Sequence, residues 1–311
     1  MEDINKTDAH YFILLAFQDL NQFQLLFFLI LFLIYIICIT GNVAIIVLVK
    51  TDISLHTPMY FFISVFATSE IFFVSTTVPS LLVNLISDSK SIPFTGCFVQ
   101  LCVLGTLGGT ECYLLAVMAF DRDLAINYPL RYSAIMRRSL CIQLGMFPWI
   151  TCLAIALVPT IFTAGLEFCG PRILNHFICD LGPLVNLACF VPFTNKAIAI
   201  FTAISEIVLP FIITLLFYIH IIAAIIQIRS ENGKKKAFST CSSHLIVSCL
   251  FYSSAIIVYV TPEGSNSDKY LALIYTVVTP LLNPFIYTFR NKDVKIAFTK
   301  LNKTILQHIF V

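Results

Sequence analysis

Three acidic residues stand inside otherwise apolar stretches of the chain, where a charge is costly. Glu70, Glu111 and Glu206 each lie in a long run of mostly apolar residues. A carboxylate in such surroundings must find a partner, bind a cation or be protonated. Arg122 follows Glu111 by about three helical turns, which places both on one helix face. These groups could serve ion binding, ligand binding or proton transfer.

The elements that carry these groups are predicted to be membrane-spanning helices. The chain of 311 residues is 59% hydrophobic and 12% charged, which is too apolar for a soluble domain. A helix needs about 20 apolar residues to cross a bilayer. Seven stretches meet this requirement: 25–49, 58–82, 97–120, 141–163, 197–228, 237–260 and 271–289. The composition therefore predicts an all-α membrane protein, a bundle of seven transmembrane helices.

The distribution of Lys and Arg predicts the orientation of this bundle. If residues 1–24 are extracellular, fourteen of the nineteen Lys and Arg residues fall in inner segments. Basic loops favour the cytoplasmic side, so we expect a plasma-membrane protein with its N-terminus outside, a transmembrane domain over 25–289 and a cytoplasmic tail over 290–311. The polar start of the chain does not resemble a cleavable signal peptide, so the first span is expected to direct insertion. The basic inner face fits anionic lipid better than nucleic acid.

Cysteines and a glycosylation signal fit the same topology. Four Cys fall on the predicted outer side, where disulfides persist, and sequence alone allows three pairings among them. They are Cys97, Cys169, Cys179 and Cys189. The other seven lie in or against the spans, where we expect small buried thiols. Asn5 begins an Asn-Lys-Thr acceptor for glycosylation on the outer side.

Several longer motifs are typical of one family. LHTPMYFFIS at 55–64 and KAFSTCSSHL at 236–245 are the most specific, and they are joined by the motifs Gly41-Asn42, MAFDRDLAINYPLRY at 118–132, HFICD at 176–180 and PLLNPFIYTFRN at 280–291. Over nearly its whole length the chain resembles the odorant (olfactory) receptors, within the rhodopsin-like (class A) G-protein-coupled receptors. The resemblance implies a small organic odorant as ligand and a stimulatory heterotrimeric G protein that raises cAMP as partner.

The chain departs from the family pattern beside Arg122. The family usually has Asp-Arg-Tyr, and this chain has Asp121-Arg122-Asp123. A second carboxylate at this place could hold Arg122 more tightly in the inactive state and lower basal activity. Asn127 and Tyr128 replace the residues that usually follow.

The resemblance also implies roles for the outer cysteines and the buried acids. It pairs Cys97 with Cys179 and Cys169 with Cys189. It groups Glu70 and Glu111 with Asn42 and Asn283 in a polar cluster that often surrounds a sodium ion, and a plain hydrogen-bond network is the alternative. No other cofactor is expected.

A ligand pocket is expected in the outer half of the bundle. Glu206 lies one turn before Pro210, where its carboxylate could pair with an amine or accept from a hydroxyl; a protonated acid bonded to a neighbouring helix is the alternative. Further pocket residues are predicted on four spans. Those on span three are small or apolar, and those on spans five and seven are polar. Those on span six are spaced i, i+3, i+4 and i+7, which places them on one helix face. The full set is Leu104, Gly105, Gly108, Gly109, Thr202, Tyr252, Ala255, Ile256, Tyr259 and Thr276. Helix packing is the simpler explanation of such stripes, and the resemblance favours a pocket.

The predicted activation switch lies at the inner end of the bundle. Asp121 and Arg122 there would be either an ordinary ion pair or part of this switch. Ligand would favour a state in which span six moves and Arg122 leaves Asp121 for Tyr218 and His244. The other predicted switch residues are Asn283, Pro284 and Tyr287 of the Asn-Pro-x-x-Tyr motif. Residues 292–306 have apolar side chains on one face and predict a short amphipathic helix on the inner leaflet.

Three other classes of protein were weighed. The chain has no Gly-rich phosphate loop, no His-Glu-x-x-His and no convincing nucleophile with a base, so it is not expected to be an enzyme. A proton-coupled transporter could use the three intramembrane acids, but no repeated halves are visible. A non-odorant class A receptor stays the nearer alternative.

Overall fold

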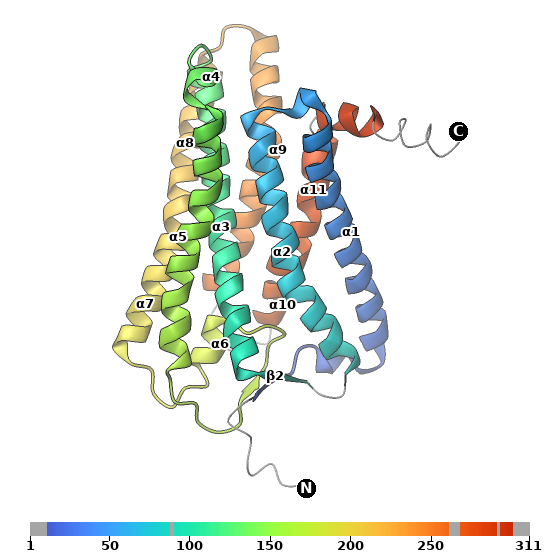
Figure 1. Cartoon of the computed structure of the whole chain (residues 1–311), viewed down its shortest axis with the longest axis vertical. Coiled ribbons are helices and arrows are strands. Elements are labelled where there is room, and N and C mark those ends of the chain that lie inside the picture. The colour runs from blue at the N-terminus through green and yellow to red at the C-terminus, as the bar shows by residue number, and fades with distance from the viewer. Residues whose placement is uncertain (1–10, 88–89, 261–267, 291–292, 301–311) are drawn as a thin grey trace, which may run out of the picture.

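Seven membrane-spanning segments form an upright bundle (Figure 1). The computed structural model describes residues 11–87, 90–260, 268–290 and 293–300. Within these ranges, four spans are the single long helices α1 (Gln24–Thr51), α2 (Pro58–Ile86), α3 (Phe94–Asn127) and α5 (Arg138–Ala164). The fifth joins α7 (Phe193–Ala203), η3 (Ile204–Val208) and α8 (Leu209–Gln227), the sixth is α9 (Glu231–Val260), and the seventh joins α10 (Asp268–Leu273), η4 (Ile274–Val278) and α11 (Thr279–Arg290). The seven predicted spans are confirmed.

Two spans contain a π-helical turn directly before a proline. The segment η3 ends two residues before Pro210, and η4 ends two residues before Pro280. A proline cannot donate to the carbonyl four residues earlier, and a π turn accommodates that missing bond. The sequence did not predict these π turns, which contain Glu206 and Thr276.

One end of the bundle, here called the N-terminal face, is closed by a small sheet that the sequence did not predict. The sheet has the order β2-β1-β3, built from β1 (Tyr11–Leu14), β2 (Ser91–Pro93) and β3 (Ile173–Leu174). Strand β1 pairs antiparallel with β2 and parallel with β3. The short helix α6 (Leu181–Val185) and the 3-10 helix η1 (Gln18–Phe23) lie at the same end (Figure 1). The chain before α1 is thus tied to two loops.

The opposite end, here called the C-terminal face, carries short helices that connect or follow the spans. These are the 3-10 helix η2 (Ile53–Leu55), helix α4 (Tyr132–Ile135) and a helix over 293–300. Val294 and Ala297 of this last helix are buried against the bundle, as expected for its apolar face. The Tyr60 hydroxyl donates to Asp293 at 3.1 Å, and Lys300 lies 3.6 Å from Asp52. The predicted residues beyond 300 lie outside the described part of the chain.

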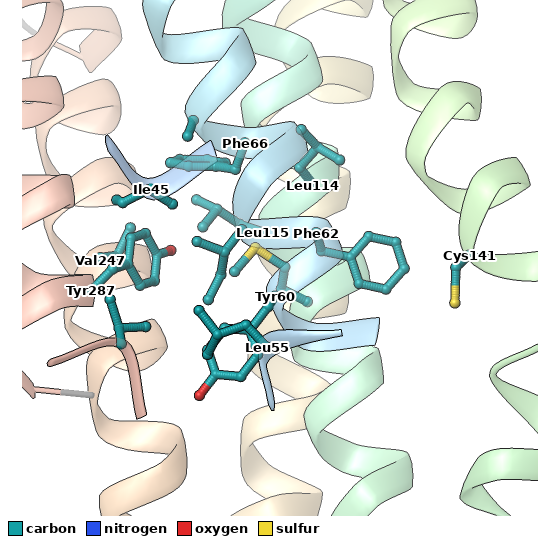
Figure 2. Packing of buried hydrophobic residues seen from close by; sticks show 14 of the residues in the cluster. Ile45, Leu55, Tyr60, Phe62, Phe66, Leu114, Leu115, Cys141, Val247 and Tyr287 are labelled. Carbon is teal, nitrogen blue, oxygen red and sulfur yellow. The ribbon is translucent and has the colours of Figure 1, made fainter. Parts of the chain in front are cut away.

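Toward this face, large apolar side chains fill the space between α1, α2, α3, α9 and α11 (Figure 2). Phe62, Phe66, Leu114 and Leu115 are fully buried there. The outward surfaces of the spans remain apolar, with Leu25, Leu33 and similar residues exposed, as expected for helices that face lipid. A continuous apolar core therefore fills the part of the bundle nearest the C-terminal face.

Candidate functional site

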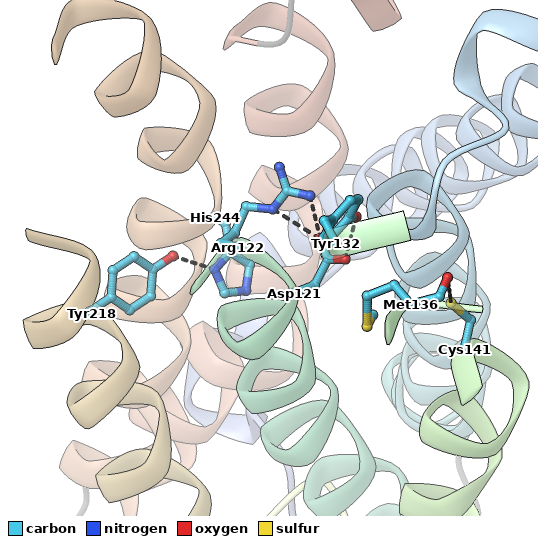
Figure 3. A network of polar contacts seen from close by, with 7 residues as sticks. All are labelled: Asp121, Arg122, Tyr132, Met136, Cys141, Tyr218 and His244. Atoms are coloured by element: carbon cyan, nitrogen blue, oxygen red, sulfur yellow. Dashed lines mark hydrogen bonds and ion pairs between the residues drawn. The ribbon is translucent and has the colours of Figure 1, made fainter. Parts of the chain in front are cut away.

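At the C-terminal face, Arg122 is held by its own neighbour on α3. Its guanidinium pairs with the Asp121 carboxylate, with Nε at 3.1 Å from Oδ2 (Figure 3). The Tyr132 hydroxyl of α4 donates to the other Asp121 oxygen at 2.7 Å. Asp121 and Arg122 are both buried. Separating a buried arginine from its carboxylate would leave two unpaired buried charges, which is costly. The pair therefore keeps this conformation unless Arg122 gains another hydrogen-bond partner.

The proposed acceptors of Arg122 form a second pair beside the first. The Tyr218 hydroxyl of α8 is hydrogen-bonded to His244 Nδ1 of α9, and their rings are stacked (Figure 3). His244 is fully packed, and its Nε2 has no hydrogen-bond partner among the described residues. The structure thus places Tyr218 and His244 together and leaves Arg122 on Asp121. That is the arrangement before the exchange predicted from the sequence.

Asp123 does not reinforce Arg122, contrary to the hypothesis drawn from the sequence. Its carboxylate faces α8, where Oδ1 lies 2.7 Å from His220 Nδ1. Asn127 Nδ2, one turn further along α3, donates to the same oxygen at 2.8 Å. Adjacent helical residues point about 100° apart, so neighbours on either side of Arg122 cannot both reach it easily. Sequence reasoning missed His220, because no pattern linked it to Asp123.

The buried acids of α2 and α3 meet in the middle of the bundle. Asn283 Nδ2 of α11 donates to Glu70 Oε1. The other Glu70 oxygen, both Glu111 oxygens, Ser69 Oγ and Asn283 Oδ1 have no hydrogen-bond partner within the described part of the chain. Asn42 is buried too, but its amide donates to Cys38 O of its own helix at 3.1 Å. Such a concentration of unsatisfied oxygens is unusual in a protein interior, and either a proton or a cation would satisfy them.

Glu206 lies on η3 between α3 and α5. It is 6% exposed, and its Oε1 has no hydrogen-bond partner in the described chain. A Cβ added at Gly109 would lie 3.0 Å from Glu206 Cδ and 3.0 Å from Cys152 Sγ. Thr202 Oγ1, one turn earlier, is also buried without a hydrogen-bond partner among the described residues. One oxygen of each of these two residues is thus left unsatisfied within that part of the chain.

The predicted pocket glycines of α3 are closely approached by side chains of other spans. A Cβ at Gly105 would meet Ala156 of α5 at 3.2 Å, and one at Gly108 would meet the Tyr275 hydroxyl at 3.1 Å. The missing side chains at Gly105 and Gly109 let α5 approach α3. At Gly108 the neighbour is the seventh span. At these positions the missing side chains allow close helix packing, and their part in a ligand pocket stays a prediction.

The remaining predicted pocket residues differ in how they lie. Tyr252 and Ala255 of α9 are buried, and the Tyr252 hydroxyl donates to Cys112 O at 2.9 Å. Thr276 is buried and bonds back to Ala272 O, whereas Ile256 is 38% exposed on another face of α9. Leu104 packs partly buried against the core. The side chain of Tyr259 and all of Asn5 lie outside the described residues.

The N-terminal face is held by covalent and polar contacts. The structure contains the disulfides Cys97–Cys179 and Cys169–Cys189, the pairs that the resemblance implied. Of the other seven cysteines, Cys249 is exposed on α9, contrary to expectation. His176 is buried, and burial lowers the pKa of its imidazole. Its Nδ1 accepts from the Ile178 N–H at 3.2 Å, which requires the neutral ring.

An open cavity of about 570 Å³ lies at this face, well away from Glu206. Its wall includes Tyr11 of β1 and Phe94 of α3. Phe168 and Arg172, from the loop that follows α5, complete it. The Arg172 guanidinium lies 5.5 Å from the centroid of the Phe168 ring and 5.9 Å from that of Phe94. The sequence gave no signal for this cavity, because its walls come together only through the sheet.

The chain has seven spans and a buried Asp-Arg pair near the end of the third. A disulfide ties the start of that third helix to the long loop that follows α5. Together these features define a G-protein-coupled receptor of class A. The family profile described as "Olfactory receptor" matches residues 31–305. The chain is 43% identical to the human Olfactory receptor 11L1 over 304 residues, which cover 97% of this chain and 94% of that protein. It is 44% identical to the mouse Olfactory receptor 6E1 over 302 residues, which cover 94% and 95%.

The human Olfactory receptor 11H4 gives a similar result, with 44% identity over 306 residues, 96% of this chain and 94% of that protein. The chain therefore belongs to the olfactory receptor family. Members of this family are receptors rather than enzymes. Neither a transporter nor a non-odorant receptor fits these matches.

Proposed function

We propose that this olfactory receptor binds a small organic odorant in the half of the bundle nearest the N-terminal face. Binding activates a stimulatory heterotrimeric G protein at the C-terminal face and raises cAMP. The single observation that carries this proposal is the pair of adjoining buried contacts, Arg122 with Asp121 and Tyr218 with His244. The first contact lies within α3 and the second joins α8 to α9, and both bonds can be exchanged without unfolding any helix.

The ligand would lie between α3, η3, α9 and η4. Glu206 and Thr202 would supply unsatisfied acceptors from the fifth span, and the buried residues Tyr252, Ala255 and Thr276 would complete the site from α9 and η4. A mostly apolar site with a few polar groups suits a small organic molecule. The ligand must make its own room, because the described side chains pack closely around Gly109. A ligand that separates α3 from η3 would therefore change the helix arrangement as it binds.

Activation would proceed by exchange of partners at the C-terminal face. In the ligand-bound state Arg122 leaves Asp121 for the Tyr218 hydroxyl and His244, while Tyr132 continues to donate to Asp121. Ligand achieves this only through its higher affinity for the second arrangement. Asn283, Pro284 and Tyr287 connect the buried acids to this exchange, since Tyr287 is buried and its hydroxyl has no partner among the described residues.

Glu70 and Glu111 are suited to hold a sodium ion with Asn283. Carboxylate and amide oxygens are hard ligands of the kind such cations prefer, and four of these oxygens lack a hydrogen bond within the described chain. Asn42 would contribute less, because its amide is bonded to its own helix. A bound sodium ion would offset the charge of one carboxylate, with the other acid protonated, and would hold α2, α3 and α11 together. This favours the inactive arrangement.

We place the receptor in the plasma membrane with the N-terminal face outside. The basic loops at the C-terminal face support this orientation, as does the position of both disulfides at the opposite end. Residues 1–24 would be extracellular, 25–289 the receptor domain and 290–311 the cytoplasmic tail. Asn5 would then be available for glycosylation.

A cAMP assay in transfected cells against a mixed odorant panel tests the proposal. The parent receptor and Glu206→Gln would be compared, with Glu231→Gln as the matched control because Glu231 is exposed at the other end. We expect the parent and the control to respond and Glu206→Gln to lose response to amine- or hydroxyl-bearing odorants by about tenfold or more. An unchanged response of Glu206→Gln would show that this residue is structural. A surface-expressed parent that is silent to every odorant would contradict the proposal.

A further inference from the structure

The contact between Asp123 and His220 joins two spans at the C-terminal face and takes no part in the exchange of Arg122. Asp123 is buried, and His220 is half exposed on α8. Since a carboxylate can only accept, His220 Nδ1 carries the proton in this 2.7 Å contact. Asn127 donates to the same oxygen from one turn along α3 and so fixes the direction in which the carboxylate faces.

His220 and Tyr218 fix α8 on two different sides. Residues two apart on a helix point about 200° apart, so the two side chains leave α8 in nearly opposite directions. Tyr218 reaches His244 on α9, and His220 reaches Asp123 on α3. The end of α8 is therefore held between its two neighbours, and it cannot move away from α3 while the second contact stays intact.

We propose that Asp123, Asn127 and His220 form a latch that holds α8 against α3 in the inactive state and sets the threshold for activation. The latch acts beside the Arg122–Asp121 pair and independently of it, because the two carboxylates face different helices. The regulatory part of this inference rests on the proposed function, in which Tyr218 must change partners. A contact that immobilises α8 opposes that change, so the latch lowers basal signalling.

The latch is tested first by hydrogen exchange on the purified receptor in lipid nanodiscs, a readout that needs no G protein. Asp123→Ala and His220→Ala should each speed amide exchange in residues 219–227 by about three- to tenfold, and the double variant should add little. Glu231→Gln, an exposed charge removal on the same face, should leave these rates unchanged. Unchanged rates in both single variants would overturn the latch.

A second test protects against a variant that simply fails to fold. Asp123→His would place two imidazoles together, which is a suitable pair of ligands for Zn²⁺. Added Zn²⁺ should then slow exchange in 219–227 in this variant and have no effect in Asp123→His/His220→Ala. Equal effects of Zn²⁺ on both would show that residues 123 and 220 are not adjacent.

Basal cAMP in cells separates the regulatory claim from the proposed function. With equal surface expression, Asp123→Ala and His220→Ala should raise basal cAMP by about three- to tenfold, as expected for loss of one buried hydrogen bond. Faster exchange with unchanged basal cAMP, in a parent that does respond to odorant, would overturn the regulatory role alone. A parent without any cAMP response would instead count against the proposed function, while the exchange experiments still decide whether the latch exists.

Discussion

Gly41 of α1 packs closely against Pro284 of α11, and an alanine there should destabilise the receptor. A Cβ at this position would lie 3.0 Å from Pro284 Cβ and 3.3 Å from Pro284 Cγ. A proline ring has no alternative rotamer, so the two helices must separate. Overpacking of this kind costs about 1–3 kcal/mol, and the preference of a helix for Ala over Gly offsets about 1 kcal/mol. We expect a net loss of up to about 2 kcal/mol in the free energy of unfolding.

Gly96→Ala is the matched control, with the opposite sign expected. Gly96 lies in the first turn of α3, and a Cβ there would meet nothing nearer than Ile92 Cγ1 at 3.5 Å, an ordinary contact. The helix preference then acts alone and stabilises by up to about 1 kcal/mol. Heating the purified receptor and following the monodisperse fraction by size exclusion should show Gly41→Ala melting below the parent, by up to about 8 °C. A Gly41→Ala variant as stable as Gly96→Ala would refute the close packing of these helices.

Three further predictions concern the N-terminal face and the switch. Loss of Cys97–Cys179, with a separation of 82 residues, should cost up to about 4.5 kcal/mol against about 3.3 for Cys169–Cys189, with a separation of 20, so surface labelling should fall further for Cys97→Ser than for Cys169→Ser. Because burial lowers the pKa of His176, the unfolded chain binds more protons, so melting temperature should fall as pH drops below about 6.5 in the parent and less in His176→Gln; a parallel decline in both would contradict this. Tyr218→Phe should keep the fold but reduce odorant-driven cAMP severalfold, since the bond to His244 and the proposed partner of Arg122 are both lost; full signalling by this variant would contradict the exchange.

The sequence predicted the seven spans because each is a long apolar run, but it placed several of their ends too early. The third span was expected to end at residue 120, whereas α3 continues to Asn127. Hydropathy indicates where a segment leaves the hydrocarbon core of the bilayer. The helix itself can continue beyond that point for as long as its backbone hydrogen bonds are made. Asp121, Arg122 and Asp123 are therefore on a continuous helix, which explains why they point in different directions.

The unpredicted features all depend on segments far apart in the sequence. Strand β1 pairs with loops that follow it by some eighty and one hundred sixty residues, and no local pattern specifies such partners. The contact of Asp123 with His220 spans 97 positions. The glycines of α3 were correctly noticed as small, but whether a small residue opens a cavity or admits a neighbour depends on the facing helix. Sequence reasoning thus found the chemistry-bearing groups and missed which of them meet.

The most direct test of the account is the cAMP response of Arg122→Ala beside the parent receptor, at equal surface expression and with an odorant that activates the parent. We predict loss of the odorant response, because Arg122 is the group that leaves Asp121 for Tyr218 and His244 in the proposed exchange. A full response from Arg122→Ala would contradict the proposed switch.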